Sequence, residues 1–162
     1  MAPSVYIETT IPSFLVGDAS AIVVTAGHQI TTRRWWRERR QDYRLYISRL
    51  VREEVSRGKS GLSRERLALL ANLPQLAITD AVLQFAQELR DYLGLPESAE
   101  PDAVHLAVAS YYRMDYLLTW NLKHIANGHV RRALDRLSAR HETYFPTICT
   151  PDELLGLEDN DE

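Results

Sequence analysis

The chain has 162 residues, a formal net charge of −3 at pH 7 and one cysteine. This length indicates a single domain, and a composition with 45% hydrophobic and 25% charged residues is ordinary for a globular protein. No apolar run approaches the roughly 20 residues of a membrane span, and the N-terminus lacks the basic-then-apolar pattern of a signal peptide. The single Cys149 excludes an intrachain disulfide framework and a cysteine-based zinc site. It fits a reducing cytoplasm, which is the location we expect.

Charge is unevenly distributed along the chain. Segment 33–40 holds five arginines against one glutamate, and segment 123–140 holds five lysines and arginines against one aspartate. The tail beyond Pro151 is acidic. Basic segments on a mildly acidic protein suit a polyanion that binds beside a locally acidic site, although each segment alone reads better as a solvated helix face.

The first predicted element is a buried strand over residues 4–8 that ends on the carboxylate of Glu8. A carboxylate at the carboxyl end of a core strand lies where open α/β sheets bind their ligands. The alternative is an acid that only accepts turn hydrogen bonds from Thr9 and Thr10. Pro12 and Gly17-Asp18 predict a turn, and a helix over about 20–40 follows.

Residues 44–48 predict a second strand, and its last residue, Ser48, can cap a helix that runs to Arg57. A short helix over about 63–71 and an extended piece at 75–79 come next. The apolar residues of these segments recur at helical or strand spacing, which is the basis for each assignment.

Asp80 is predicted to cap the most regular helix, whose apolar residues recur at helical spacing as far as Leu93 and which Gly94 stops. Pro101 opens a further helix through Arg113. Its alanines make it small-sided, as if it packs tightly against a sheet.

An apolar strand is predicted at 116–120, a helix around the stripe 130–137, and a last strand at 144–147. Pro146 interrupts that last strand and places it at a sheet edge. Residues 150–153 form a capping box that starts a short C-terminal helix. Strands that alternate with helices predict one α/β domain with a mostly parallel central sheet and helices on both faces.

Two further carboxylates lie on helix faces that point toward the core. Glu54 shares a face with Leu50 and Val51, where a charge needs a partner. Arg52 or Arg57 would serve as an ion-pair partner, and a metal ion is the functional alternative. The neighbouring Glu53 is rotated away from this face.

Asp102 occupies the first turn of the helix opened by Pro101, where carboxylates also suit the helix dipole. His105 shares its face at i+3. Two readings of His105 are open: it holds the outer oxygen of Asp102, or it is a partly buried histidine, and we prefer the second.

These acids are expected to converge. In a parallel sheet the residues just past strands 4–8 and 116–120 emerge at one edge, which brings Glu8, Glu54, Asp102 and Asn121 toward a single pocket. Three carboxylates together need cations. Oxygen ligands with one amide and no cysteine point to Mg²⁺ or Mn²⁺ rather than zinc, and so to metal-dependent hydrolysis of a phosphodiester.

Four stretches together resemble the PIN-domain nucleases, in particular the VapC-type toxins of bacterial toxin–antitoxin pairs: VYIETTIPS at 5–13, Glu54-Val55, PDAVHLA at 101–107 and LTWN at 118–121. The resemblance implies a three-layer PIN-like nuclease domain over residues 1–150, followed by a short C-terminal helix and acidic tail over 151–162. It also implies an endoribonuclease that uses Mg²⁺ or Mn²⁺, is inhibited by a small antitoxin and often assembles as a dimer.

By this resemblance Glu8 is the ligand from the first strand, Glu54 the second acid and Asp102 the third. Most such proteins have aspartate at the first position, and the fourth acid, often aspartate, is here Asn121. The first change alters metal placement, and the second weakens the claim to a second metal ion. Both changes together read as compensation rather than decay.

The leading hypothesis is hydrolysis of RNA by in-line attack of water at phosphorus. Asn121 would orient metal or water, and Lys123 with His124 would neutralise the scissile phosphate. Basic residues, among them Arg131 and Arg132, would track the RNA backbone.

Trp35 or Trp36 would stack on an unpaired base, with core or dimer packing as the alternative. A second hypothesis is a catalytically weak PIN-fold module that binds RNA or an antitoxin. A DNA nuclease ranks last, because the chain lacks an extra helical clamp.

Overall fold

Strand β1 (Ser4–Ile7) is the centre of a parallel sheet, and all four of its residues are buried. The structure, a computed structural model, describes residues 1–58 and 60–156. Within these residues the sheet has five strands in the order β3-β2-β1-β4-β5, and every neighbouring pair is parallel. The other strands are β2 (Arg44–Ser48), β3 (Gln75–Leu76), β4 (Tyr116–Leu118) and β5 (Thr147–Cys149).

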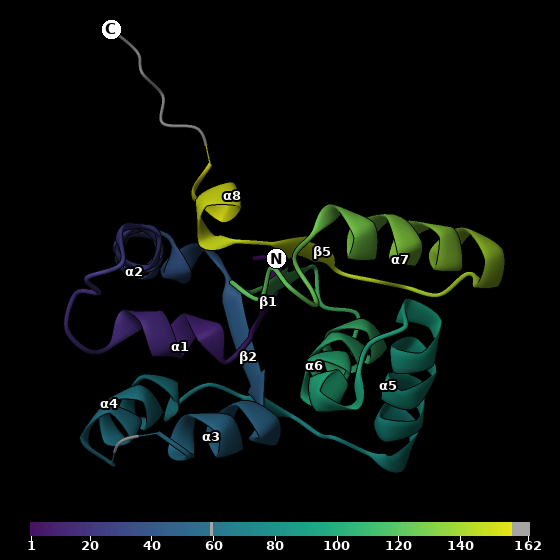
Figure 1. The fold of residues 1–162 in the computed structure, drawn as a ribbon, viewed down its shortest axis with the longest axis horizontal. Helices are drawn as coiled ribbons and strands as arrows, with labels where there is room; N and C mark the ends of the chain where they lie inside the picture. Colours follow the sequence, from purple (N-terminus) through teal and green to yellow (C-terminus); the bar gives the residue numbers. More distant parts are fainter. Residues whose placement is uncertain (59, 157–162) are drawn as a thin grey trace, which may run out of the picture.

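Helices connect the strands and flank the sheet (Figure 1). In that view α1 to α4 gather on the left and α5 to α7 on the right, with α5 packed beside α6. Two short 3₁₀ turns, η1 (Arg40–Asp42) and η2 (Glu97–Ala99), join longer elements. The helices are α1 (Thr10–Leu15), α2 (Val23–Glu38), α3 (Arg49–Ser56), α4 (Ser60–Leu70), α5 (Asp80–Leu93), α6 (Glu100–Tyr111), α7 (Gly128–His141) and α8 (Pro151–Leu155).

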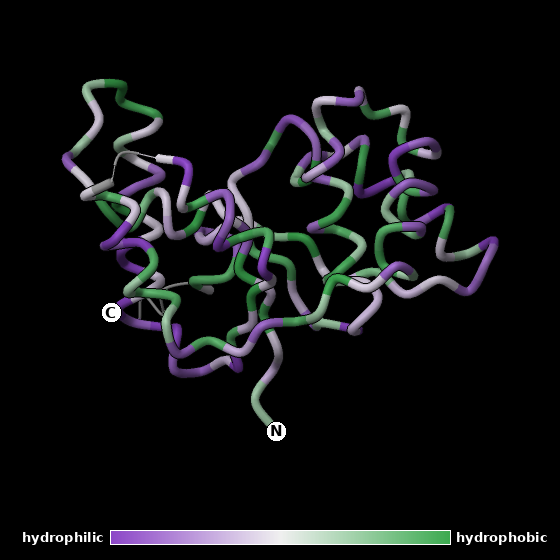
Figure 2. Tube along the Cα trace, turned by 90° about the horizontal axis from the view of Figure 1, so that it is seen from below, coloured by the Kyte–Doolittle hydropathy of each residue, from purple (hydrophilic) through white to green (hydrophobic). Residues whose placement is uncertain are grey.

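Helix α6 is the most deeply buried helix segment of the core. Every residue from Ala103 to Ser110 is buried, which confirms the prediction of a small-sided helix that packs tightly. Hydrophobic segments run through the middle of the molecule in Figure 2, where the central strands lie. A helix this enclosed can carry polar groups only where they find partners, and His105 is one of them.

The order of the strands creates a switch point beside β1. From β1 the chain moves to β2 and β3 on one side, and then returns to place β4 on the other side. Open α/β sheets bind ligands in the crevice at the carboxyl ends of the two strands that flank such a point. Glu8 follows β1 and Thr119 follows β4, so both residues lie at this crevice.

The predicted parallel α/β sheet and its edge strand are confirmed, with three local corrections. The turn predicted around Pro12 is wrong, because residues 10–15 form α1. The last strand begins at Thr147 rather than Tyr144, because Pro146 cannot donate a ladder hydrogen bond. Helix α2 begins at Val23, later than predicted.

Two predicted helix caps differ from the observed ones. Thr79, not Asp80, is the N-cap of α5, and its side chain accepts from the Val82 N–H. Ser48 occupies the N-cap position of α3 but makes no side-chain cap hydrogen bond. Gly94 ends α5 in the left-handed conformation, with φ of 64°, as its predicted role as a stop requires.

Two predictions for the C-terminal part of the chain are confirmed, the capping box of the last helix and the burial of Cys149. Thr150 and Glu153 form the capping box of α8. Cys149 is buried, and burial raises the pKa of its thiol to about 12, so it behaves as a small hydrophobic residue. The acidic tail lies, from residue 157 onward, outside the described residues. Among the helices that the structure describes, none is long and apolar enough to cross a membrane.

Asn127 fixes the start of α7, and its replacement should destabilise the fold. Its Oδ1 accepts from the Val130 N–H at 3.0 Å, and its Nδ2 donates to the carbonyls of Leu122 and Lys123. We expect Asn127→Ala to lower the free energy of unfolding by about 1–2 kcal/mol, the usual value of an N-cap. Urea titration measures this change. Asn72→Ala, at an exposed residue, is the matched control, and an equal effect in both variants would contradict the capping role.

Candidate functional site

Glu8 is held by one of its two carboxylate oxygens. Its side chain is buried, with 3% of the residue exposed. Oε2 accepts hydrogen bonds from the backbone N–H of Thr10 (3.0 Å), from Thr10 Oγ1 (2.6 Å) and from Thr119 Oγ1 (2.8 Å). Within residues 1–58 and 60–156, Oε1 has no hydrogen-bond partner, so it remains available to a ligand.

Glu54 is held in the same one-sided way. Its Oε1 accepts from Thr9 Oγ1 at 2.8 Å and from His105 Nε2 at 2.5 Å. No described residue donates to its Oε2, and 23% of its side chain is exposed. Burial alone would raise the pKa of this carboxyl, but the hydrogen bond and charge of His105 outweigh it, so the pKa lies below its ordinary value.

His105 lies fully buried between the acids. Burial by itself lowers the pKa of an imidazole. The hydrogen bond to Glu54 and the negative charges of Glu8, Glu54 and Asp102 oppose burial, and they raise the pKa of His105 above its ordinary value. All three acids predicted from the sequence therefore lie within electrostatic reach of one side chain. When His105 is protonated, its positive charge lies beside these acids and offsets their mutual repulsion.

Asp102 and Asn121 form the other half of the site. Asp102 Oδ2 is 2.8 Å from Nδ1 of His124, which donates the hydrogen bond. Asn121 Oδ1 accepts from the backbone N–H of His124 at 3.0 Å, and the backbone N–H of Asn121 donates to Thr119 Oγ1. The loop after β4 thus brings Asn121 and His124 to the start of α6.

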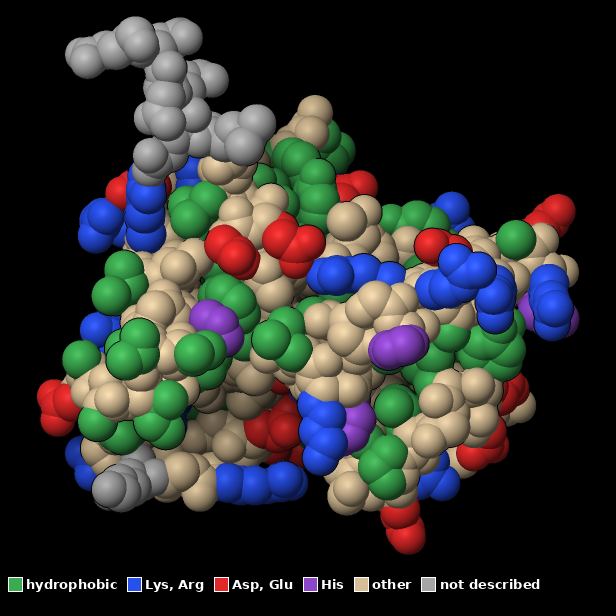
Figure 3. Space-filling view, turned by 45° about the horizontal axis from the view of Figure 1, so that its top comes forward, with side chains coloured by type: hydrophobic (Ala, Val, Ile, Leu, Met, Phe, Trp, Pro, Cys, Tyr) green, Lys and Arg blue, Asp and Glu red, His purple; other side chains and the backbone are tan. Residues whose placement is uncertain are grey.

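The four predicted residues share a neighbourhood, but they do not form a finished coordination sphere. In the part of the chain that the structure describes, no group of three or more His, Cys, Asp and Glu side chains is arranged to hold a metal ion. A shared cation site therefore requires side-chain rotation from the observed positions. Figure 3 shows acidic side chains at the floor of a hollow near the centre of that face, with basic and histidine side chains beside them.

The chemistry of the donors fits a hard divalent cation. Glu8, Glu54 and Asp102 each engage one oxygen with the protein and leave the other without a hydrogen bond from any described residue. Carboxylate oxygens are the ligands that Mg²⁺ and Mn²⁺ prefer, and cysteine is absent from the site. Free oxygens of this kind are the atoms through which such a cation would be held.

Several expectations about partners need correction. Glu54 pairs with His105 and Thr9, and Arg57 contributes only a longer-range charge. His105 is fully buried and binds Glu54, so the preference for a partly buried histidine and the alternative contact with Asp102 are both wrong. The reading of Thr9 and Thr10 as turn donors is half right, since Thr10 donates to Glu8 but Thr9 donates to Glu54.

The basic and aromatic candidates lie in different settings. Lys123 is exposed on the loop after Asn121. Trp35 is fully buried in the core, which excludes it as a base-stacking platform, while Arg40 covers the ring of Trp36.

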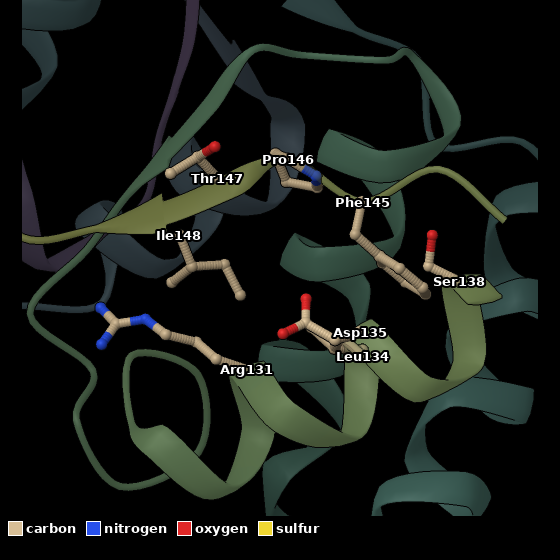
Figure 4. A pocket seen from close by; sticks show the side chains of 8 residues that line it. All are labelled: Arg131, Leu134, Asp135, Ser138, Phe145, Pro146, Thr147 and Ile148. Carbon is tan, nitrogen blue, oxygen red and sulfur yellow. The ribbon is translucent and has the colours of Figure 1, made fainter.

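Arg131 lines a cavity of about 300 Å³ between α7 and β5 (Figure 4), and its guanidinium pairs with Glu153 at 3.0 Å. Arg132, on the same helix, is exposed. Neither arginine contacts Glu8, Glu54 or Asp102. If they bind RNA, they would contact its phosphate backbone away from the scissile bond.

Sequence reasoning missed the buried residues whose hydrogen bonds hold His105 and the loop after β4 in place. Tyr6 and Ser48 are buried and continue the hydrogen-bond chain from His105. Trp120 anchors the loop after β4, because its Nε1–H donates to Thr32 Oγ1 at 2.7 Å and its ring stacks on His28. The available signal was a polar residue inside a buried strand, Tyr6, which apolar periodicity alone does not distinguish from a core aromatic.

The fold and the site define a class: a parallel α/β domain with carboxylates at its topological switch point. The PIN domain family matches residues 15–128, and the chain belongs to this family. PIN domains are nucleases and generally use divalent metal ions.

Solved structures support the fold, whereas no curated protein matches the chain in sequence. A chain from the crystal structure of VapBC2 from Rickettsia felis, bound to a DNA fragment from their promoter, is similar with a TM-score of 0.52. The two chains are 15% identical, and the similarity covers 90% of this chain and 97% of that one. At this identity the likeness concerns the fold.

The His105–Glu54 pair should stabilise the cation-free protein in a limited pH window. The raised pKa of His105 contributes stability below its ordinary value of 6.5, and this is lost as pH rises through the folded pKa. The lowered pKa of Glu54 contributes above its ordinary value of 4.5, and this is lost as pH falls through the folded pKa. The contribution is therefore largest between pH 4.5 and 6.5.

A double-mutant cycle with His105→Leu and Glu54→Gln in EDTA measures this contribution. We expect a coupling energy of about 1–2 kcal/mol in the window, because Glu54 is partly exposed, and a decline as pH rises above 6.5 through the folded pKa of His105. A coupling energy that stays constant across the whole range would contradict the charged pair.

Proposed function

We propose that this protein is a metal-dependent endoribonuclease that uses Mg²⁺ or Mn²⁺ and acts as the toxin of a type II toxin–antitoxin pair. The observation that carries the proposal is the arrangement of Glu8, Glu54 and Asp102 around His105, each with one oxygen free of protein donors. Membership of a nuclease family supports the reaction class. The nuclease domain would span residues 1–150, with 151–162 as a C-terminal helix and tail.

The residues of the site have separate roles in this proposal. Glu8, Glu54 and Asp102 would hold the cation, which supplies activation of water and neutralisation of charge on the phosphoryl oxygens. Asn121 offers a side-chain Nδ2 that no described residue accepts from, so it can orient water or a phosphate oxygen. Lys123, which is exposed on the loop after Asn121, would neutralise the scissile phosphate.

RNA would be held by basic residues outside the acidic centre. His124 contributes from the loop of Asn121, although its Nδ1 is engaged by Asp102. Arg132 is exposed, and Arg131 is tied to Glu153 by an ion pair with side chains 37% and 48% exposed. Exposed pairs of this kind contribute only about 0–1 kcal/mol. An RNA phosphate can therefore compete for Arg131.

A protein partner is the other half of the proposal. The similar chain comes from a structure named VapBC2, and by analogy a small antitoxin would inhibit this protein in the cytoplasm. Four exposed aliphatic side chains at the N-cap and in the first half of α2 support a protein interface, with the antitoxin or a second copy of the chain, because exposed apolar surface marks such sites. They are Ile22 (66% exposed), Val23 (84%), Val24 (66%) and Ile30 (68%).

A catalytically weak module that binds RNA or antitoxin is the second candidate. The observation that favours it is Asn121, whose Oδ1 closes the turn to His124 rather than facing the acids. A module of this kind would keep the fold and bind RNA without cleaving it.

Cleavage of RNA should depend on Asp102 and on a divalent cation. Purified protein, separated from any bound partner, is incubated with a mixed RNA pool in Mg²⁺ or Mn²⁺. We expect Asp102→Asn to lower the cleavage rate by more than about 100-fold. Loss of a residue that hydrogen-bonds a metal ligand already lowers activity by about 10- to 100-fold, and loss of the ligand itself should lower it at least as much. Gel analysis of the products gives the rates, and EDTA should abolish cleavage.

Asp91→Asn is the matched control, since Asp91 is exposed on α5 and, among the described residues, its side chain is hydrogen-bonded only to Gln87. The control should cleave at the wild-type rate. Cleavage that persists in EDTA, or equal rates in wild type and Asp102→Asn, would overturn the nuclease proposal. Binding of RNA without any cleavage would favour the weak module.

A further inference from the structure

A buried chain of hydrogen bonds leads from the core to Glu54. The Tyr6 hydroxyl is hydrogen-bonded to Ser48 Oγ at 2.8 Å and to His105 Nδ1 at 2.7 Å. The opposite nitrogen of the ring, Nε2, donates to Glu54 Oε1 at 2.5 Å. Tyr6, Ser48 and His105 are each fully buried, so water does not compete for these bonds.

Each member of this chain lies close in sequence to one of the acids. Tyr6 lies in β1, two residues before Glu8, and Ser48 immediately precedes α3, the helix of Glu54. His105 lies one helical turn after Asp102 on α6. The three hydrogen-bonded side chains therefore cross-link the three elements whose ends form the site.

Ordinary packing does not account for this arrangement. Ser48 is the N-cap residue of α3, where a side-chain cap usually contributes about 1 kcal/mol, yet its hydroxyl is engaged by Tyr6 and makes no cap bond. Burying a hydroxyl, a phenol and an imidazole also has a desolvation cost that apolar residues would avoid. What the polar chain provides, and apolar packing cannot, is a directed hydrogen bond to one oxygen of Glu54.

We propose that Tyr6 and Ser48 are positioning residues that act through His105. They fix the imidazole so that it holds Glu54 Oε1, with help from Thr9 Oγ1, and leave Oε2 facing the site. The inference rests on the proposed function, because it assigns that free oxygen to the cation. It adds residues that touch neither cation nor substrate.

The test uses the full-length protein and two readouts. The first is the ¹⁵N signals of the His105 ring nitrogens in EDTA at fixed pH, which report its tautomer and hydrogen bonds without any metal. The second is the affinity for Mn²⁺ by calorimetry. The variants are Tyr6→Phe, Ser48→Ala, His105→Leu and His105→Gln, and circular dichroism at the working temperature confirms that each is folded.

We expect Tyr6→Phe to shift the His105 signals and to weaken Mn²⁺ binding by about 10- to 100-fold, the range for outer partners of ligands. Ser48→Ala should have a smaller effect of the same kind. It also keeps the proposal testable if Tyr6→Phe fails to fold. His105→Gln keeps a donor for Glu54, and it should bind Mn²⁺ more tightly than His105→Leu. Tyr46→Phe is the matched control, because Arg44 is the one described residue that hydrogen-bonds the Tyr46 hydroxyl.

Folded Tyr6→Phe and Ser48→Ala with wild-type Mn²⁺ affinity would overturn the inference and leave the proposed function intact. Equal affinity of His105→Gln and His105→Leu would also overturn it, since a merely structural role predicts no rescue by the amide. Wild-type protein that binds no Mn²⁺ while the His105 signals still respond to Tyr6→Phe would instead overturn the proposed function, and with it the assignment of Oε2.

Discussion

A fully buried imidazole that lies within electrostatic reach of three carboxylates is the interaction on which the rest of the site depends. The switch in strand order brings the ends of β1 and β4 together, and α6 runs back along the sheet to the same edge. Carboxylates gathered there repel one another unless positive charge is near. In the cation-free protein, the pKa of His105 is raised, and the imidazole when protonated places positive charge inside the core, where its field is weakly screened.

Holding each carboxylate by one oxygen follows from the same constraint. Hydroxyl and imidazole donors fix the inner oxygens of Glu8 and Glu54, while the outer oxygens have no donor among residues 1–58 and 60–156. The side chains are thereby held in place while each carboxylate keeps one oxygen without a hydrogen-bond donor from the described residues. A ligand can therefore bind through the outer oxygens, where it displaces no protein donor. This explains how a site without a finished coordination sphere remains compatible with a cation.

Much of the fold was predictable because its signals are local. The strands at 44–48 and 116–120, the helix stop at Gly94 and the capping box at Thr150 follow from spacing and turn chemistry within a few residues. The convergence of acids followed from topology. The partners did not, because Tyr6, Ser48 and His105 meet only in three dimensions, at sequence separations that periodicity does not encode. Helix α1 was missed because Pro12 was read as a turn, although proline is tolerated in a first helical turn.

The central claim, that Glu8, Glu54 and Asp102 share one cation, is tested most directly by diffraction from crystals grown with Mn²⁺. An anomalous difference map locates the ion independently of any assumption about the site. The account predicts a peak within bonding distance, about 2 Å, of one oxygen from each of the three carboxylates. A map with no peak among these side chains, or with Mn²⁺ bound by other residues while the three acids keep their observed positions, would contradict it.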